Sequence, residues 1–283
     1  MNKKIVYFDC SSGVSSDMLL GSLIDLGADI ETIRNECLKL PLPKSQITAN
    51  KIKRKDVEGM DFSVNVYYEF QHEYDFLRGE EDERELSKIP EHDHGFKLHK
   101  DKEHGNIYMI SMEISEIIRI FEESSMNSNV KQMALNIYKV IAEAEAKVHN
   151  VSADDIVLHE VGRAEQIITV AGICTAIDML GINKIMCSAV RDGSGHVMTS
   201  HGKMQVPVPA VLEIIKKCDI PIIIDSEHNT EMVTPTGIGA LVGLGAEYAK
   251  SPSLKPDKIG YGFGKRETGL LAAVRAILAE ESN

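Results

Sequence analysis

The sequence predicts a mixed α/β fold: a single compact domain with alternating strands and helices and a mobile polar insertion. Short runs of β-branched residues alternate with segments of helical hydrophobic spacing, and no segment is repeated. The 283 residues are 43% hydrophobic and 26% charged, which is typical of a globular chain with a sizeable core. Alternation of this kind favours helices packed against a sheet.

The first part of the chain is expected to run strand, helix, helix, strand, strand. The strand KKIVYF leads into a Ser/Gly loop, and a helix follows that a serine can cap and Gly27 ends. A second helix is expected over residues 30–40, because a proline comes next. Alternating hydrophobicity over residues 46–54 and 60–70 predicts two strands.

Residues 71–106 are expected to form a flexible insertion. They are rich in Glu, Asp, Lys and His and lack periodic hydrophobicity. Such a segment can collect divalent cations loosely, or it can simply be solvated charge, and the sequence favours neither interpretation. The residues concerned are His92, Asp93, His94, His99, Asp101, Glu103 and His104.

Beyond the insertion, helices and strands alternate again. Apolar spacings of three and four predict helices over residues 130–148 and 164–180, and Gly172 inside the second indicates close packing. KIMCSAV and PIIID predict strands. Pro209 suits the first turn of one later helix, and Pro235 opens a Gly-rich helix.

Charge and cysteine content disfavour several function classes. With 43 acidic and 31 basic residues the net charge is −12, which disfavours nucleic acid and anionic membranes as partners. The five cysteines contain no CxxC pair, so neither a disulfide framework nor a zinc ribbon is indicated. Without an evident signal peptide or membrane-spanning run, the chain is expected to be cytoplasmic.

Two segments at helix starts predict an anion-binding surface. Free backbone amides and the helix dipole attract a negative group at such positions. A simple helix cap is the alternative interpretation of each segment. The candidate residues are Asp9, Ser11, Ser12, Gly13 and Asp17 in the first segment, and Thr234, Thr236 and Gly237 in the second.

Metal ligands are expected in the segment VLHEVG and just after it. His159, Glu160 and Glu165 combine imidazole and carboxylate groups, which suit nickel, zinc or manganese. A hydrogen-bonded structural histidine near an apolar strand is the alternative interpretation.

A second histidine-containing segment is DGSGHVMTSHG. A turn here can bring His196 and His201 face to face as metal ligands, and the backbone of Gly193, Ser194 and Gly195 can cradle an anion. The alternative is an ordinary Gly-rich hairpin.

Taken in order, seven segments resemble the N-terminal part of the LarC-like nickel-insertion proteins. The resemblance runs from Ile5 to about Leu278. The segments are YFDCSSGVSSDMLLGSLIDLGAD, AEAEAKVHNV, LHEVG, DGSGHVMTSHG, VPVPA, VTPTG and GYGFGKR.

The resemblance implies an enzyme of nickel-pincer cofactor biosynthesis, a CTP-dependent nickel chelatase of the lyase class. Such proteins insert Ni²⁺ into a pyridinium bisthiocarboxylic acid mononucleotide, with Mg²⁺ or Mn²⁺ accompanying CTP. Residues 1–283 correspond to the family's N-terminal domain, so the nucleotide-binding C-terminal domain is expected on a separate partner. His159, Glu160 and Glu165 are then the expected catalytic residues, with His196 and His201 as further metal ligands, and we also expect a homo-oligomer.

Several positions depart from the family pattern. The family usually has His at Val157 and Asp at Glu165 and Thr169, while Ser16 and Gln205 replace its Gly and Pro. These departures favour an alternative hypothesis: a catalytically degenerate paralogue that binds metal or nucleotide or regulates a full-length enzyme. The retained His159, Glu160 and GSGH favour nickel insertion.

Overall fold

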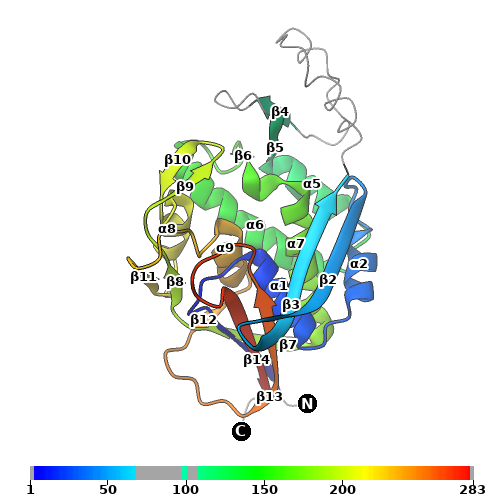
Figure 1. Ribbon diagram of the computed structural model, residues 1–283. Helices are drawn as coiled ribbons and strands as arrows, with labels where there is room; N and C mark the ends of the chain where they lie inside the picture. Colours follow the sequence, from blue (N-terminus) through cyan, green and yellow to red (C-terminus); the bar gives the residue numbers. More distant parts are fainter. Residues whose placement is uncertain (1–2, 68–96, 101–106, 281–283) are drawn as a thin grey trace.

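The computed structural model describes residues 3–67, 97–100 and 107–280 (Figure 1). In these residues a mixed seven-stranded sheet is packed with helices, which confirms the predicted mixed α/β class. Most of the predicted insertion, residues 71–106, lies outside the described residues, apart from strand β4 (Lys97–Lys100). No helix of the described residues is long and apolar enough to cross a bilayer.

The sheet brings the beginning and the end of the chain together. β1 lies between β7, to which it is parallel, and β14, to which it is antiparallel. In the order β12-β7-β1-β14-β13-β3-β2, the strands are Glu247–Tyr248, Ile182–Cys187, Lys4–Asp9, Ala273–Glu280, Pro256–Phe263, Val57–Val66 and Ser45–Arg54. As a result, the Ser/Gly loop after β1 leaves from the middle of the sheet.

Helix α1 (Ser16–Asp25) lies directly on this sheet, and glycines in β13 permit the approach. A Cβ on Gly262 would lie 2.0 Å from the carbonyl oxygen of Met18, and one on Gly260 would lie 2.5 Å from that of Ser22. These distances are far inside van der Waals contact, so the GYGFG segment needs glycine at both positions.

The remaining helices form a layer around α6 and α7, which run through the centre of the helical part in Figure 1. Their bounds are α2 Ile30–Cys37, α5 Ile114–Glu123, α6 Ser128–His149, α7 Ala164–Leu180, α8 Pro209–Ile215 and α9 Pro235–Gly243. The close packing predicted at Gly172 is confirmed, because a Cβ there would lie 2.6 Å from Leu20 of α1.

Helix α2 ends earlier than predicted. After Cys37 the chain tightens into turns with short-range hydrogen bonds, from Lys39 N–H to the Glu36 carbonyl and from Leu40 N–H to the Cys37 carbonyl. These bonds satisfy the last carbonyls of the helix. The helix therefore ends before Pro41, which was expected to end it.

Three smaller sheets lie outside the seven-stranded sheet. β9 (His196–Thr199) and β10 (Gly202–Gln205) form the Gly-rich hairpin that the sequence allowed. β8 (Val190–Asp192) pairs with β11 (Ile222–Ile224). β5 (Ile107–Glu113) lies between β4 and β6 (Val157–Leu158), and β6 leads into a short 3₁₀ helix, η1 (Glu160–Gly162).

Candidate metal centre

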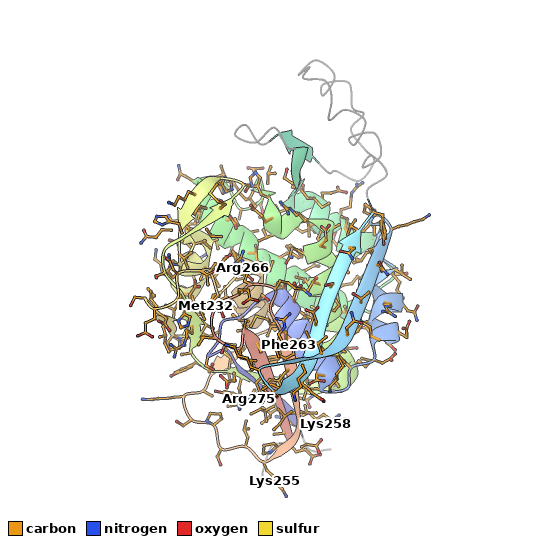
Figure 2. All side chains as sticks on the ribbon, viewed as in Figure 1. Met232, Lys255, Lys258, Phe263, Arg266 and Arg275 are labelled. Carbon is orange, nitrogen blue, oxygen red and sulfur yellow. The ribbon has the colours of Figure 1, made fainter. Side chains whose placement is uncertain are left out.

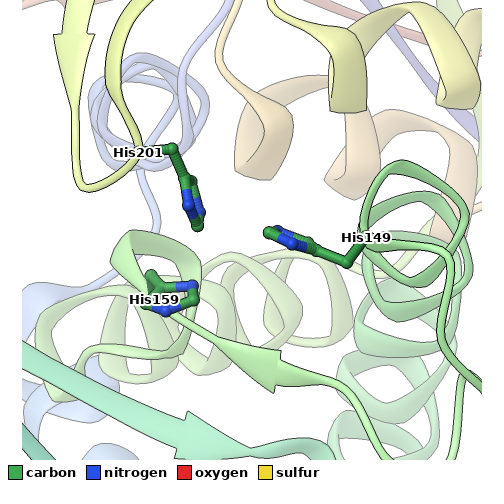
Figure 3. Close-up of side chains that lie close together, drawn as sticks. All are labelled: His149, His159 and His201. Atoms are coloured by element: carbon green, nitrogen blue, oxygen red, sulfur yellow. The ribbon is translucent and has the colours of Figure 1, made fainter.

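Three histidines from separate segments meet in one place (Figure 3). His149 is the last residue of α6, His159 lies between β6 and η1, and His201 lies in the turn of the β9–β10 hairpin. One ligand nitrogen from each lies within 4.8 Å of the others. The ring centroids are 4.7 Å apart for His149 and His201 and 4.6 Å apart for His159 and His201. This spacing allows three imidazoles to bind one metal ion.

Local backbone structure explains how His149 reaches the centre. Asn150 adopts the left-handed conformation with φ 55° and caps α6, donating its N–H to the Ala146 carbonyl. Asparagine tolerates this conformation better than most residues, so α6 ends here and the chain turns back. His149 is therefore held on the last turn of a long helix.

Two partly buried glutamates, Glu145 and Glu160, lie beside the three-histidine centre. The Glu145 carboxylate lies 3.8 Å from Nε2 of His149, one helical turn away. Burial, together with the charge of Glu160, raises the pKa of Glu145 to about 7. Burial lowers the pKa of His149, and His201 lowers it further. A lowered imidazole pKa keeps the nitrogen lone pair available to a metal ion at neutral pH.

Glu160 holds the hairpin against the centre. Its two oxygens accept hydrogen bonds from the Ser200 N–H at 2.6 Å and the Ser200 hydroxyl at 2.9 Å. Burial raises the pKa of Glu160, but hydrogen bonds, including these two, and the charge of Arg163 outweigh it, so the pKa is lowered overall and the group is anionic. Ser200 precedes His201, so the contact positions His201. Glu160 acts here beside the three-histidine centre rather than within it.

A cavity of about 750 Å³ opens beside the centre and is lined by all three histidines. Its wall includes the first turns of α1, α7 and α9, which contribute Ser16, Gln166 and Thr236. Hydrogen bonds join these residues, at 3.0 Å between Ser16 and Gln166 and 3.5 Å between Thr236 and Ser16. The volume is within the usual range for a small-molecule site.

The structure brings about half of the predicted site residues to this cavity. Those that line it are Ser12, Asp17, His159, Glu160, Glu165, His201, Thr234 and Thr236. Those outside the lining are Asp9, Ser11, Gly13, Gly193, Ser194, Gly195, His196 and Gly237.

Most of the predicted anion-binding amides are already bonded within the protein. Gly193 N–H donates to the Asp192 carboxylate at 2.8 Å, and Ser194 N–H donates to the His228 carbonyl at 2.8 Å. Gly13 N–H donates to the Cys10 carbonyl at 3.1 Å, and Gly237 N–H donates to the Thr234 hydroxyl at 3.1 Å. The helix-cap interpretation therefore describes Thr234 well.

The predicted pairing of His196 with His201 is not what the hairpin produces. His196 is exposed on β9, where it pairs with Gln205, and His201 turns instead toward His149 and His159. Asp9 forms an ion pair with Arg275 at 2.6 Å.

His149 was absent from the predicted ligands. Its position four residues after Glu145, at the end of a strongly periodic helix, was the available signal. Nothing in the local pattern says that this helix end lies beside the VLHEVG segment, because that contact is made by tertiary packing.

Comparison with known proteins agrees with the resemblance of the motifs. The family model described as nickel insertion protein matches residues 6–283. A pyridinium-3,5-bisthiocarboxylic acid mononucleotide nickel insertion protein from Acetivibrio thermocellus is 36% identical over 97% of this chain and 60% of its own length. The proteins of the same name from Lactiplantibacillus plantarum and Thermotoga sp. (strain RQ2) are each 34% identical, over 98% and 97% of this chain and 61% of their own lengths.

The chain thus spans about three fifths of the length of these curated relatives. No solved structure matches it significantly. The family model nevertheless covers almost the whole chain, including all three histidines and the cavity beside them. The chain therefore belongs to the nickel insertion protein family.

Proposed function

We propose that this chain binds Ni²⁺ at the three-histidine centre and inserts it into a pyridinium bisthiocarboxylic acid mononucleotide. The observation that carries the proposal is the meeting of His149, His159 and His201 within 4.8 Å at the edge of a large cavity. The names of the relatives supply the substrate. Nickel is the cargo of this reaction, so the centre has to hold the ion and also release it.

The donor set suits such an ion. Nickel accepts both imidazole nitrogen and sulfur, so three histidines can hold it while the thiocarboxylates of the substrate provide sulfur. Each described cysteine except Cys218 is buried, and none belongs to the three-histidine centre. The anionic Glu160 beside the histidines favours a divalent cation electrostatically.

Further parts of the proposal come from the resemblance alone. We propose that insertion depends on CTP with Mg²⁺ or Mn²⁺, bound by a C-terminal domain on a partner chain. The reaction class, a lyase-type chelatase, and a homo-oligomeric assembly belong to the same proposal. No described residue of this chain is assigned to CTP.

Titration calorimetry with Ni²⁺ tests the metal site. His149→Ala, His159→Ala and His201→Ala should each weaken Ni²⁺ binding at least about tenfold, since each removes one of three ligands. His196→Ala is the matched control, because it removes a histidine from the same hairpin but outside the centre. Unchanged affinity in His201→Ala, or no Ni²⁺ binding by the native chain, would overturn the metal site.

A second candidate function is metal or nucleotide binding without insertion. The observation favouring it is Thr169, which stands where the family usually has a carboxylate. Its hydroxyl donates to the Glu165 carbonyl at 2.7 Å and is buried in α7, so it offers a metal ion no charge. An assay of nickel transfer to the mononucleotide, with the partner domain and CTP present, separates the two functions.

A further inference from the structure

The cavity beside the three-histidine centre is lined by three basic side chains, and two of them are already paired. Lys265 donates to the Asp61 carboxylate at 2.6 Å and to the Ser63 hydroxyl at 2.9 Å. Arg266, labelled in Figure 2, forms an ion pair with the buried Glu231 and also donates to its carbonyl. Their positive charges are therefore largely neutralised within the protein.

Arg163 is the third basic residue of the lining and has no such partner. Its Nε is buried without a hydrogen-bond partner. Among the described residues no carboxylate lies within ion-pair distance of its guanidinium; the charge of Arg163 lowers the pKa of Glu160 from further away, while both oxygens of that carboxylate are hydrogen-bonded to Ser200. A buried guanidinium N–H without an acceptor is unfavourable, so a structural role leaves this side chain unexplained.

The backbone of Arg163 is nevertheless firmly fixed. Arg163 is the N-cap of α7, and its carbonyl accepts hydrogen bonds from Gln166 N–H at 2.9 Å and Ile167 N–H at 3.1 Å. Its own N–H donates to the Glu160 carbonyl. The side chain is thus presented to the cavity from a rigid position, as a binding residue requires.

The surrounding wall adds to the attraction for an anion. The first turns of α1, α7 and α9 are joined there through Ser16, Gln166 and Thr236, and helix N-termini attract negative groups. Five carboxylates line the cavity and oppose an anion: Asp17 and Glu165 in the first turns of α1 and α7, and Glu145, Glu160 and Glu231 elsewhere in the wall. The helix dipoles alone are therefore not sufficient, and the charge of Arg163 is needed.

We propose that Arg163 binds the phosphate group of the mononucleotide substrate. This rests on the proposed function, which places the thiocarboxylates at the nickel ion, because sulfur has to reach the metal. The phosphate is then the remaining anion of the substrate, and the planar guanidinium suits bidentate binding of phosphate. The substrate lies in the cavity with its ring toward the three-histidine centre and its phosphate on Arg163.

Two sulfur-free ligands test this orientation by calorimetry: nicotinate mononucleotide and nicotinate riboside, which lacks the phosphate. Arg163→Gln should weaken mononucleotide binding at least about tenfold and leave riboside binding unchanged, because a lost charge-assisted phosphate contact affects one ligand alone. The mononucleotide affinity of Arg163→Lys should lie between those of the native chain and Arg163→Gln. Lysine keeps the positive charge but cannot donate two parallel hydrogen bonds to the phosphate. Arg119→Gln, which removes a surface arginine paired with Glu116 on α5, is the control.

Three results would overturn the proposal: native-like mononucleotide affinity in Arg163→Gln, equal losses for both ligands, or no mononucleotide binding by the native chain. Arg163→Gln should also unfold at or above the native temperature, whereas a structural role would lower it. Ni²⁺ titration of the same variant should give the native affinity. Failure of the metal site would appear in the histidine variants instead, so the two proposals fail separately.

Discussion

At the scale of the residue, the cavity contains charged groups that are unfavourable to bury. Asp17, in the first turn of α1, is the clearest case. Burial raises its pKa from the usual value to about 6, although Lys265 offsets part of the effect. A helix N-terminus normally favours a carboxylate, so the effect of desolvation exceeds that of the dipole here. Such a residue reduces stability wherever it is ionised.

The pH dependence of unfolding tests this. Because the pKa of Asp17 is higher in the folded chain than in the unfolded one, the folded chain binds more protons between about pH 4 and 6. The free energy of unfolding should therefore fall as pH rises through this window. In Asp17→Asn, the free energy of unfolding should fall less over this pH range, because the titrating carboxyl is gone.

Urea unfolding at pH 4.5 and 7.5 provides the measurement. Asp56→Asn is the control, since Asp56 lies in an exposed turn and forms a surface ion pair with Lys53. Identical pH dependence in the native chain and Asp17→Asn would refute the assignment.

At the scale of the element, helix starts determine much of the cavity wall. α9 begins where the Thr234 hydroxyl accepts the Gly237 N–H at 3.1 Å, with Pro235 in the first turn. Its backbone then passes so close to the loop before α1 that a Cβ on Gly237 would lie 2.5 Å from the Val14 carbonyl oxygen. The cap therefore fixes both the helix and its contact with the Ser/Gly loop.

Thr234→Ala should lower the free energy of unfolding by about 1 kcal/mol, the usual effect of losing an N-cap oxygen. Thr234→Ser retains the hydroxyl and should stay close to the native value. Equilibrium denaturation in urea measures both. If the Ala and Ser variants were equally stable, the hydroxyl would not be acting as a cap.

The elements were predictable from the sequence to a far greater extent than the site. α6 and α7 follow from apolar spacing, and the strand KKIVYF from its β-branched content, because these patterns are local. The three-histidine centre joins the end of α6, the residue before η1 and the turn of the β9–β10 hairpin. Only tertiary packing decides that His149 belongs to it and His196 does not. The anion-binding prediction relied on glycine N–H groups. Several of these already donate hydrogen bonds within turns and helix caps.

At the scale of the whole molecule, the three-histidine centre links segments that are otherwise held by different contacts. His149 belongs to the helical layer, His159 to the β5–β6 region, and His201 to a separate two-stranded sheet. An ion bound by all three therefore stabilises the folded arrangement as a whole, because an unfolded chain does not hold the ligands together.

Thermal unfolding with and without Ni²⁺ should show this coupling. At an ion concentration a hundredfold above the dissociation constant, binding adds about 2.7 kcal/mol to the stability of the native chain. The unfolding temperature should rise for the native chain and for His196→Ala, and much less for His201→Ala. An equal rise in all three would place the ion elsewhere.

The hairpin that carries His201 also has a consequence for departure of the ion. His201 is the exposed histidine of the centre, on a turn held by hydrogen bonds between Ser200 and Glu160, whereas His149 ends a long packed helix. A metal ion exchanges its ligands one at a time. The histidine that can move with the least disruption of core packing is expected to dissociate first. Under the proposed function, a sulfur atom of the substrate would then take the coordination position that His201 leaves. Under the proposed function, the hydrogen bonds from Ser200 to Glu160 would set how readily the nickel ion passes from His201 to the substrate.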